Sequence, residues 1–293
     1  MRIKERILYF ASILAGLSFS TGLYSQQASG GLRFTTGDSI PVQMELKATV
    51  TQQAMGNAIS YDTDASAWYH YNVLETEDGK ARLQHRASRI RFSFDGMGRK
   101  SSFDSDRPDD LLGPYGETAK EILNRKFELT VDREGNVLST QPEKIESLRS
   151  AEQLVIMMGM VSDVSDLITP PQTGRASIFK VLPDHELKIG DTWTDSINNG
   201  SGLVKTTYQI TSITDSTILI DFKIEGNNVS RAELMGRETI TTLTSNGSGK
   251  IVVDKATGIF REKIQTTNYS GTMEAMGNST PVTSSTTLRI MIR

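Results

Sequence analysis

The sequence predicts a mainly β-protein, with antiparallel sheets in two related halves, half-barrel or sandwich-like, and one or two central helices. Three observations favour this fold class. Apolar and polar residues alternate in several segments with the two-residue period of a half-buried strand, as from Val42 to Gln53. Short turn signals separate these segments, which implies antiparallel pairing. Three short motifs also occur twice, which indicates related halves.

The composition is that of a globular protein with little net charge. The 293 residues include 32 Lys plus Arg and 35 Asp plus Glu, a formal net charge of −3, with 37% hydrophobic residues. Such a chain offers no basic field to a phosphate backbone, so nucleic acid is not an expected partner. Because the sequence contains no cysteine, disulfides, Cys nucleophiles and the lipid-acceptor Cys of a bacterial lipoprotein are excluded.

Residues 1–25 have the pattern of a secretory signal peptide. Three basic residues among the first six precede a largely apolar run from Ile7 to Leu23, which contains several hydroxyl residues and is short for a membrane span. We expect cleavage after Ser25, so that the exported chain begins at Gln26 and resides in the periplasm or outside the cell. No later stretch approaches membrane-spanning length, and no transmembrane segment is expected in the mature chain.

The strand pattern divides the mature chain into residues 26–139, a first β-rich half, and residues 181–293, a second β-rich half that shares its core. Further alternating runs at Ile218–Ile224 and Leu288–Ile292 support strands in the second half. Between the halves, residues 140–180 are expected to form a helix and a connector.

Helix formers with few β-branched residues predict two helices, from Gly116 to Lys126 and from Thr140 to Met160. In the second, Thr140 and Glu143 have capping-box spacing. Its apolar residues lie near one face, which predicts that it docks on the concave side of a sheet; they include Ile145, Leu148, Val155 and Met158.

Three motifs recur, each at a predicted turn. They are Gly-Asp-Ser/Thr at 37–39 and 190–192, Val-Asp followed by a glycine at 131–135 and 253–258, and Ala-Met-Gly-Asn at 54–57 and 275–278. The third motif comes early in one half and late in the other, so two related β-halves around a helical insert describe the chain better than a strict tandem duplication.

These features resemble a family of exported bacterial proteins, mostly from the Bacteroidota, that is classed only as a domain of unknown function. The resemblance rests on the signal peptide, the two Gly-Asp motifs with Trp193 after the second, the Val-Asp turns and the Met-Gly-Asn hairpin tips. It implies an envelope location and a mainly β-fold, and it carries no catalytic residues to transfer.

Catalytic motifs lack their partners. Residues 37–40, Gly-Asp-Ser-Ile, look like the nucleophile block of a hydrolase, but Ser39 would need a later Asp and His. The three histidines, at positions 70, 85 and 185, all precede the last hundred residues, where such a family would place its base. A turn at the entry to a strand is the better interpretation. No cofactor is expected.

Two further groups are candidate sites. Asp104, Asp106, Asp109 and Asp110 offer the oxygen ligands that a hard cation prefers, although a solvated acidic loop is the alternative. Trp68 shares a strand face with His70, where it could stack on a ligand or pack in the sheet.

The function that the sequence favours is an exported, non-catalytic envelope protein that binds an apolar ligand, such as a lipid, or an envelope component, including other envelope proteins. Candidate ligand-binding residues are Trp68 and three methionines that could line a pliable apolar site, Met157, Met158 and Met160. The same methionines could equally be ordinary core. A half-barrel with a groove, as in periplasmic lipoprotein carriers, would suit such a ligand. The alternatives are a structural or interaction module without a small-molecule site and, third, a hydrolase.

Overall fold

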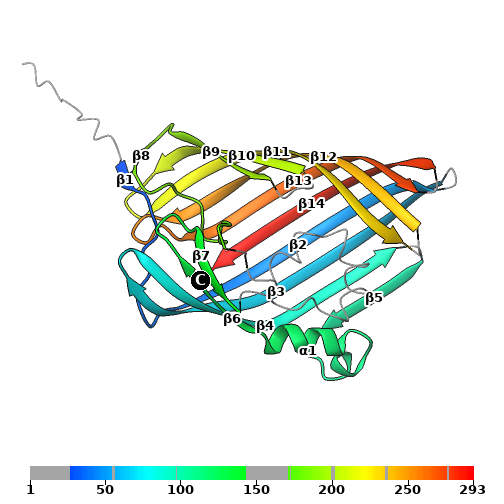
Figure 1. Ribbon diagram of the computed structural model, residues 1–293, viewed down its shortest axis with the longest axis horizontal. Helices are drawn as coiled ribbons and strands as arrows, with labels where there is room; N and C mark the ends of the chain where they lie inside the picture. The colour runs from blue at the N-terminus through cyan, green and yellow to red at the C-terminus, as the bar shows by residue number, and fades with distance from the viewer. Residues whose placement is uncertain are drawn as a thin grey trace, which may run out of the picture.

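The structure is a computed structural model that describes residues 27–54, 57–96, 98–142, 171, 173–198, 202–234, 237–275 and 277–293. Most of these residues form one broad, curved sheet (Figure 1). The strands of this 12-stranded sheet are β2 (Ser39–Ala54), β3 (Asn57–Glu77), β4 (Lys80–Gly96), β5 (Arg99–Asp104), β6 (Lys126–Val131), β7 (Val137–Gln141), β9 (Thr192–Asn198), β10 (Gly202–Ile213), β11 (Thr217–Leu234), β12 (Arg237–Asp254), β13 (Phe260–Ala275) and β14 (Asn278–Ile292).

The order of the strands joins the two halves of the chain into one sheet. Neighbouring strands follow the order β7-β6-β4-β3-β2-β14-β13-β12-β11-β10-β9, and β5 pairs with β4. The first half meets the second where β2 pairs antiparallel with β14, so that Leu46 lies opposite Leu288. Two short strands, β1 (Gln27–Ser29) and β8 (Glu186–Lys188), form a separate sheet. The predicted fold class, antiparallel and mainly β, is confirmed.

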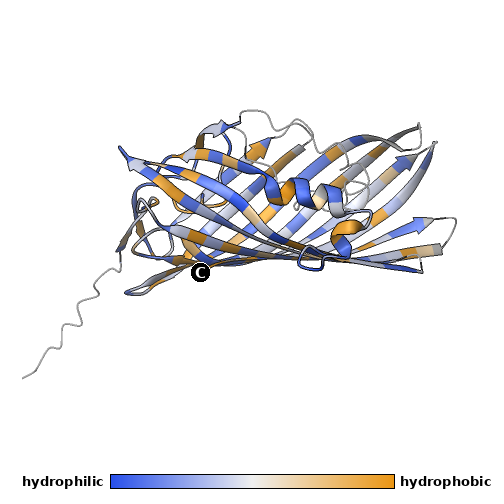
Figure 2. Ribbon diagram, turned by 90° about the horizontal axis from the view of Figure 1, so that it is seen from below, coloured by the Kyte–Doolittle hydropathy of each residue, from blue (hydrophilic) through white to orange (hydrophobic). Residues whose placement is uncertain are grey.

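Alternation along each strand gives the sheet one core face and one solvent face. In β2 the side chains of Val42, Met44 and Leu46 are buried, and their cross-strand partners continue the same face. Figure 2 shows hydrophobic and hydrophilic residues alternating along the strands.

The core shows which face is concave. One cluster contains Tyr71 and Leu83 from one side of the sheet, Ile210 and Ile220 from the other, and Phe179 from the segment between the halves. Residues so far apart in the strand order share one cluster because the sheet curves around them. We call this the concave face and the opposite one the convex face. Each large side chain buried there contributes about 1.5–3 kcal/mol of hydrophobic stabilisation.

The first predicted helix is present as α1 (Gly116–Asn124), after a short 3₁₀-helix, η1 (Asp110–Leu112). Ala119 of α1 packs with Phe92 and Phe103 in a second cluster, which covers β4 and β5 at the edge of the concave face. In the described part of the chain, no helix has the length and hydrophobicity needed to cross a membrane.

The second predicted helix does not begin at Thr140. Thr140 and Gln141 belong to β7, where they pair with Leu129 and Glu128 of β6. The Thr140 hydroxyl, expected to cap the helix, instead donates to the carbonyl oxygen of Pro171 at 2.8 Å. Strand pairing satisfies the backbone that the capping pattern would otherwise start in a helix. The rest of the predicted helix, residues 143–160, lies outside the described residues.

The repeated Gly-Asp motif forms the same turn in both halves. Gly37 and Gly190 have φ angles of 93° and 91°, which favour glycine, and they precede β2 and β9. The amide of Gly37 donates to the Val73 carbonyl at 2.9 Å, and that of Gly190 donates to the Ile210 carbonyl at 2.8 Å. The two glycines are therefore conformational, as the turn interpretation predicts.

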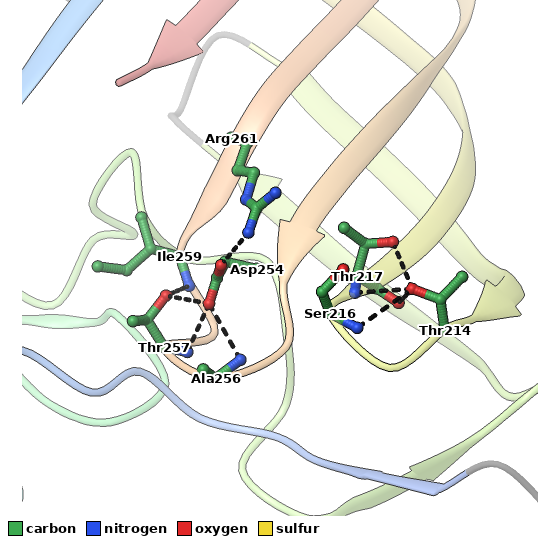
Figure 3. A network of polar contacts seen from close by, with 8 residues as sticks. All are labelled: Thr214, Ser216, Thr217, Asp254, Ala256, Thr257, Ile259 and Arg261. Atoms are coloured by element: carbon green, nitrogen blue, oxygen red, sulfur yellow. Dashed lines mark hydrogen bonds and ion pairs between the residues drawn. The ribbon is translucent and has the colours of Figure 1, made fainter.

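The repeated Val-Asp motif is also a turn organised by a carboxylate. The Asp254 carboxylate accepts from the amides of Ala256 and Thr257, both at 3.0 Å, and pairs with Arg261 at 2.5 Å (Figure 3). Figure 3 also shows Thr214 holding the neighbouring β10–β11 turn.

Asp132 performs the same role in the first half. Its carboxylate accepts from the amides of Glu134 at 3.0 Å and Asn136 at 2.8 Å. In each turn a glycine with positive φ follows, Gly135 at 86° and Gly258 at 73°. The third motif closes hairpins, because Ala54 pairs with Asn57 and Ala275 with Asn278.

Candidate functional site

The burial of residues on the concave face changes along its strands. At one end residues 179–187 pack on it through Phe179, Leu182 and Leu187, which are buried. Toward the β2–β3 and β13–β14 hairpins many of its residues on β12, β13 and β14 are half-buried, whereas Val50, Tyr61 and Thr239 there are buried. We call this part the hairpin half of the concave face.

Small and apolar residues make up much of the hairpin half. Leu243, Gly271 and Val282 lie side by side on β12, β13 and β14, and all are half-buried. In the next row, Ser245 lies between Gly226 and Tyr269. Because the two glycines carry no side chain, they add nothing to fill the concavity. Such a surface can hold an apolar body and offer a few hydroxyl groups to it.

A buried aromatic cluster lies under the packed end. His85 stacks on Phe127 with ring centroids 4.3 Å apart, and it lies 5.1 Å from both Tyr69 and Tyr71. Tyr71 in turn packs against Phe179 at 5.0 Å. Within the part of the chain that the structure describes, neither ring nitrogen of His85 nor the Tyr69 hydroxyl has a hydrogen-bond partner. The cluster thus buries three polar atoms that have no partner among the described residues.

Burial, with a smaller effect from the nearby His70, lowers the pKa of His85 to about 3. The folded state therefore keeps this imidazole neutral between about pH 3 and pH 6.5, where the unfolded chain binds a proton. Stability attributable to His85 is complete above pH 6.5 and is lost as the pH falls toward 3.

Replacing His85 with phenylalanine should therefore reduce the acid sensitivity of the fold. Between pH 7 and pH 4 the free energy of unfolding should fall by roughly 3 kcal/mol more in the parent than in the variant. The reason is that only the parent has an imidazole at position 85, which binds a proton when the chain unfolds. Urea denaturation at both pH values measures the difference. His185→Gln, at an exposed histidine, is the control and should follow the parent. An identical pH profile for His85→Phe and the parent would contradict a neutral buried imidazole.

A polar pocket of about 420 Å³ lies beside the β3–β4 turn. Arg33, Lys80 and Arg133 contribute cations, and Asp132 is among its carboxylates. Several of these groups are already bonded: Arg133 pairs with Asp184 at 3.3 Å, and Asp132 holds its own turn. The pocket therefore does not match the expected apolar site.

Of the four candidate ligand residues, the structure describes Trp68. Trp68 lies on the convex face, opposite Arg89, whose guanidinium is 4.7 Å from the centre of the indole ring. Tyr69 and Tyr71, its neighbours along β3, lie on the concave face. Met157, Met158 and Met160 lie outside the described residues.

The acidic loop is tied together by protein groups. The Asp104 carboxylate pairs with Arg89 at 2.6 Å, and the Asp110 carboxylate accepts the Asp104 amide at 2.7 Å and pairs with Arg107 at 2.7 Å. The hydrogen bonds from Arg89 lower the pKa of Asp104 despite its burial. Asp106 pairs with Arg89 at 3.0 Å, while Asp109 is exposed and precedes η1.

These contacts give the acidic residues a structural role. Among the residues that the structure describes, no group of three or more His, Asp or Glu side chains is arranged to hold a metal ion. The metal hypothesis stays a prediction. Ser39 is exposed at the start of β2, and no hydrogen bond joins it to a histidine in the described ranges.

The fold and its two faces define a class of protein, an open, curved antiparallel sheet with a packed apolar end and a partly half-buried concave surface. Residues 172–260, which run from before β8 to the first residue of β13, match the model of a "Family of unknown function (DUF6263)". This confirms the expected likeness to a family without an assigned activity. Comparison with curated proteins gives no match.

Solved structures show likenesses at low identity. A structure of lipid–protein interactions in lipovitellin is 8% identical, with a TM-score of 0.47 over 89% of this chain, which spans 25% of the lipovitellin chain. An outer membrane channel from Pseudomonas putida F1 is 7% identical, with a TM-score of 0.27 over 89% of this chain and 97% of that one. The β-domain of a Bordetella autotransporter is 8% identical, with a TM-score of 0.25 over 86% and 98% of the two chains.

Proposed function

We propose that this protein is exported to the cell envelope and binds an apolar ligand, such as a lipid, on the hairpin half of the concave face, without catalysing a reaction. The observation that supports this function is the continuation of the concave face beyond the packed core. There, Leu243 and Val282 are half-buried on either side of Gly271. Removing such apolar surface from water by a ligand stabilises the complex by about 25 cal/mol per Å².

The chemistry of the face also sets what kind of ligand fits. Hydroxyl groups of Ser245, Tyr269 and Ser284 form the row next to the apolar one. The apolar row can contact a long apolar chain, and the hydroxyl row can hydrogen-bond a polar group on it. The face therefore fits an amphipathic ligand better than a pure hydrocarbon. A catalytic role has no comparable support, because the exposed Ser39 has no histidine partner in the part of the chain described.

Filling the concave face should abolish binding. Ser245→Trp places a large side chain into the hairpin half, whereas Asn246→Trp places the same side chain on the convex face, one residue along β12. We expect a fluorescent fatty-acid probe to bind the parent and the Asn246 variant, with at least about tenfold weaker binding to the Ser245 variant. Native mass spectrometry of protein purified from its own envelope would identify the natural ligand.

Absence of a bound lipid and of probe binding to the parent protein would contradict the ligand proposal. That result would favour the alternative function, a structural or interaction module. Its concave face would then bind another envelope protein. Equal probe binding to both tryptophan variants would instead move the ligand away from the concave face.

Export is tested separately. The basic start and apolar run of residues 1–25 predict a mature chain that begins at Gln26, within about three residues. The intact mass of protein recovered from the envelope fraction measures this end directly. Retention of residues 1–25 in that fraction would contradict processing by a signal peptidase.

A further inference from the structure

Four arginines of β4 lie on the convex face, Arg82, Arg86, Arg89 and Arg91. The guanidinium of Arg91 lies 5.9 Å from the centre of the Trp68 ring, and two of the others are paired with carboxylates. Arg82 pairs with Glu75 at 3.2 Å and Glu128 at 3.0 Å, and Arg89 pairs with two carboxylates of the acidic loop. Arg86 lies between these neutralised residues, is exposed, and has no ion pair among the described residues. Glu128, the carboxylate nearest to it on β6, is already held by Arg82 and Gln84.

The neighbours of Arg86 across the sheet are also basic. His70 of β3 lies directly opposite on one side, and Lys126 of β6 lies directly opposite on the other. We call these three residues the cationic row. Side chains in such positions have Cβ atoms about 5 Å apart, and like charges there destabilise a sheet. The fold thus places two full cations and an imidazole together, and within the described ranges none of the three forms an ion pair with a carboxylate.

Groups beside the cationic row extend its chemistry. On one side lies the half-buried indole of Trp68, next to His70 on the same strand face and with the guanidinium of Arg89 4.7 Å from its ring centre. On the other side Asn72 and Gln84 lie opposite each other and present amides. Cations, amides and an aromatic ring within a few strand spacings are groups that recognise a saccharide bearing negative charges.

We propose that the cationic row and Trp68 form a binding site for an acidic polysaccharide on the convex face, separate from the concave ligand site. The row runs across β3, β4 and β6 and therefore follows the curvature of the sheet. A flexible linear chain can follow this curved path, whereas a flat membrane would meet a convex surface only along part of it. The net charge of −3 makes this local basic surface distinct from the rest of the protein.

Calorimetric titration with galacturonic acid oligomers tests the site. We expect binding that weakens as salt rises, and at least about tenfold loss of affinity in the double variant Arg86→Gln, Lys126→Gln. The matched control is Lys205→Gln, Lys223→Gln, which removes two exposed cations from the convex face of β10 and β11 and should bind like the parent. A neutral glucan of the same length should not bind.

The stability of the variants separates binding from structure. Since Arg86 faces like charges, Arg86→Gln should melt at the same temperature as the parent or higher at low salt. A lower melting temperature would mean that Arg86 stabilises the fold, and equal affinity of both double variants for the oligomers would refute the site.

Other anions serve as competitors. Inorganic phosphate or vesicles containing phosphatidylglycerol that bind as tightly as the oligomers, and lose binding in the same variant, would overturn the choice of a polysaccharide. The fatty-acid probe should bind the Arg86/Lys126 variant normally, so this proposal and the concave ligand site fail independently.

Discussion

Replacing Phe179 with alanine should destabilise the protein by about 3–5 kcal/mol, as expected for a large buried aromatic residue. Phe179 is fully buried and lies between Phe34, with ring centroids 5.4 Å apart, and Tyr71, 5.0 Å away. It connects the segment between the halves to the concave face, so its loss leaves a cavity at the packed end. Chemical denaturation of the two proteins measures the difference.

The control for this experiment is Leu112→Ala. Leu112 has 83% of its surface exposed, although it is as hydrophobic as a core residue. Its truncation should change stability by less than about 0.5 kcal/mol. A Phe179→Ala variant as stable as the Leu112→Ala variant would show that the segment between the halves is not docked on the sheet.

Replacing Gly258 with alanine should cost about 2–5 kcal/mol, because two effects add. Its φ of 73° disfavours any residue with a Cβ, and a Cβ there would lie 2.3 Å from the carbonyl oxygen of Gly31. In the same turn the Thr257 carbonyl accepts a hydrogen bond from the Arg33 amide at 2.7 Å. The clash with Gly31 would therefore push the N-terminal segment away from the sheet.

Gly37 and Gly190 separate the two effects. Both have positive φ, and a Cβ at either would meet nothing within 4 Å. Alanine there should cost about 1–2 kcal/mol, the conformational part alone. The differences among the three variants in the midpoint of chemical denaturation measure how much the close approach of position 258 to the Gly31 carbonyl contributes. If all three variants lose the same stability, the contact between Gly258 and Gly31 does not contribute.

The strands that the sequence predicts are those with a strict two-residue alternation. The run from Val42 to Gln53 lies within β2, and Leu288–Ile292 ends β14. In contrast, residues 241–249 of β12 are mostly Thr, Ser, Asn and Gly, which give no clear period. That stretch is held in the sheet by β11 and β13 on either side, a non-local effect that a local pattern does not contain.

At Thr140, by contrast, a local pattern predicted the start of a helix where the structure has a strand. Thr140 and Glu143 have the spacing of a helix start, yet Thr140 ends up buried in β7. Local propensity was overruled by pairing with β6. The basic character of β4 was present in the sequence as Arg82, Arg86, Arg89 and Arg91, but the sequence did not reveal which of them would be neutralised.

The sequence by itself determined the antiparallel β-class, the Gly-Asp and Val-Asp turns, and helix α1, because each depends on residues close together in the chain. Only the tertiary structure decided that β2 pairs with β14, that Leu243 and Val282 flank Gly271 on the concave face, and that His70, Arg86 and Lys126 form one row. The physical reason is that register between distant strands is fixed by matching buried faces across the whole sheet, and a shift of one residue would turn every side chain to the other face.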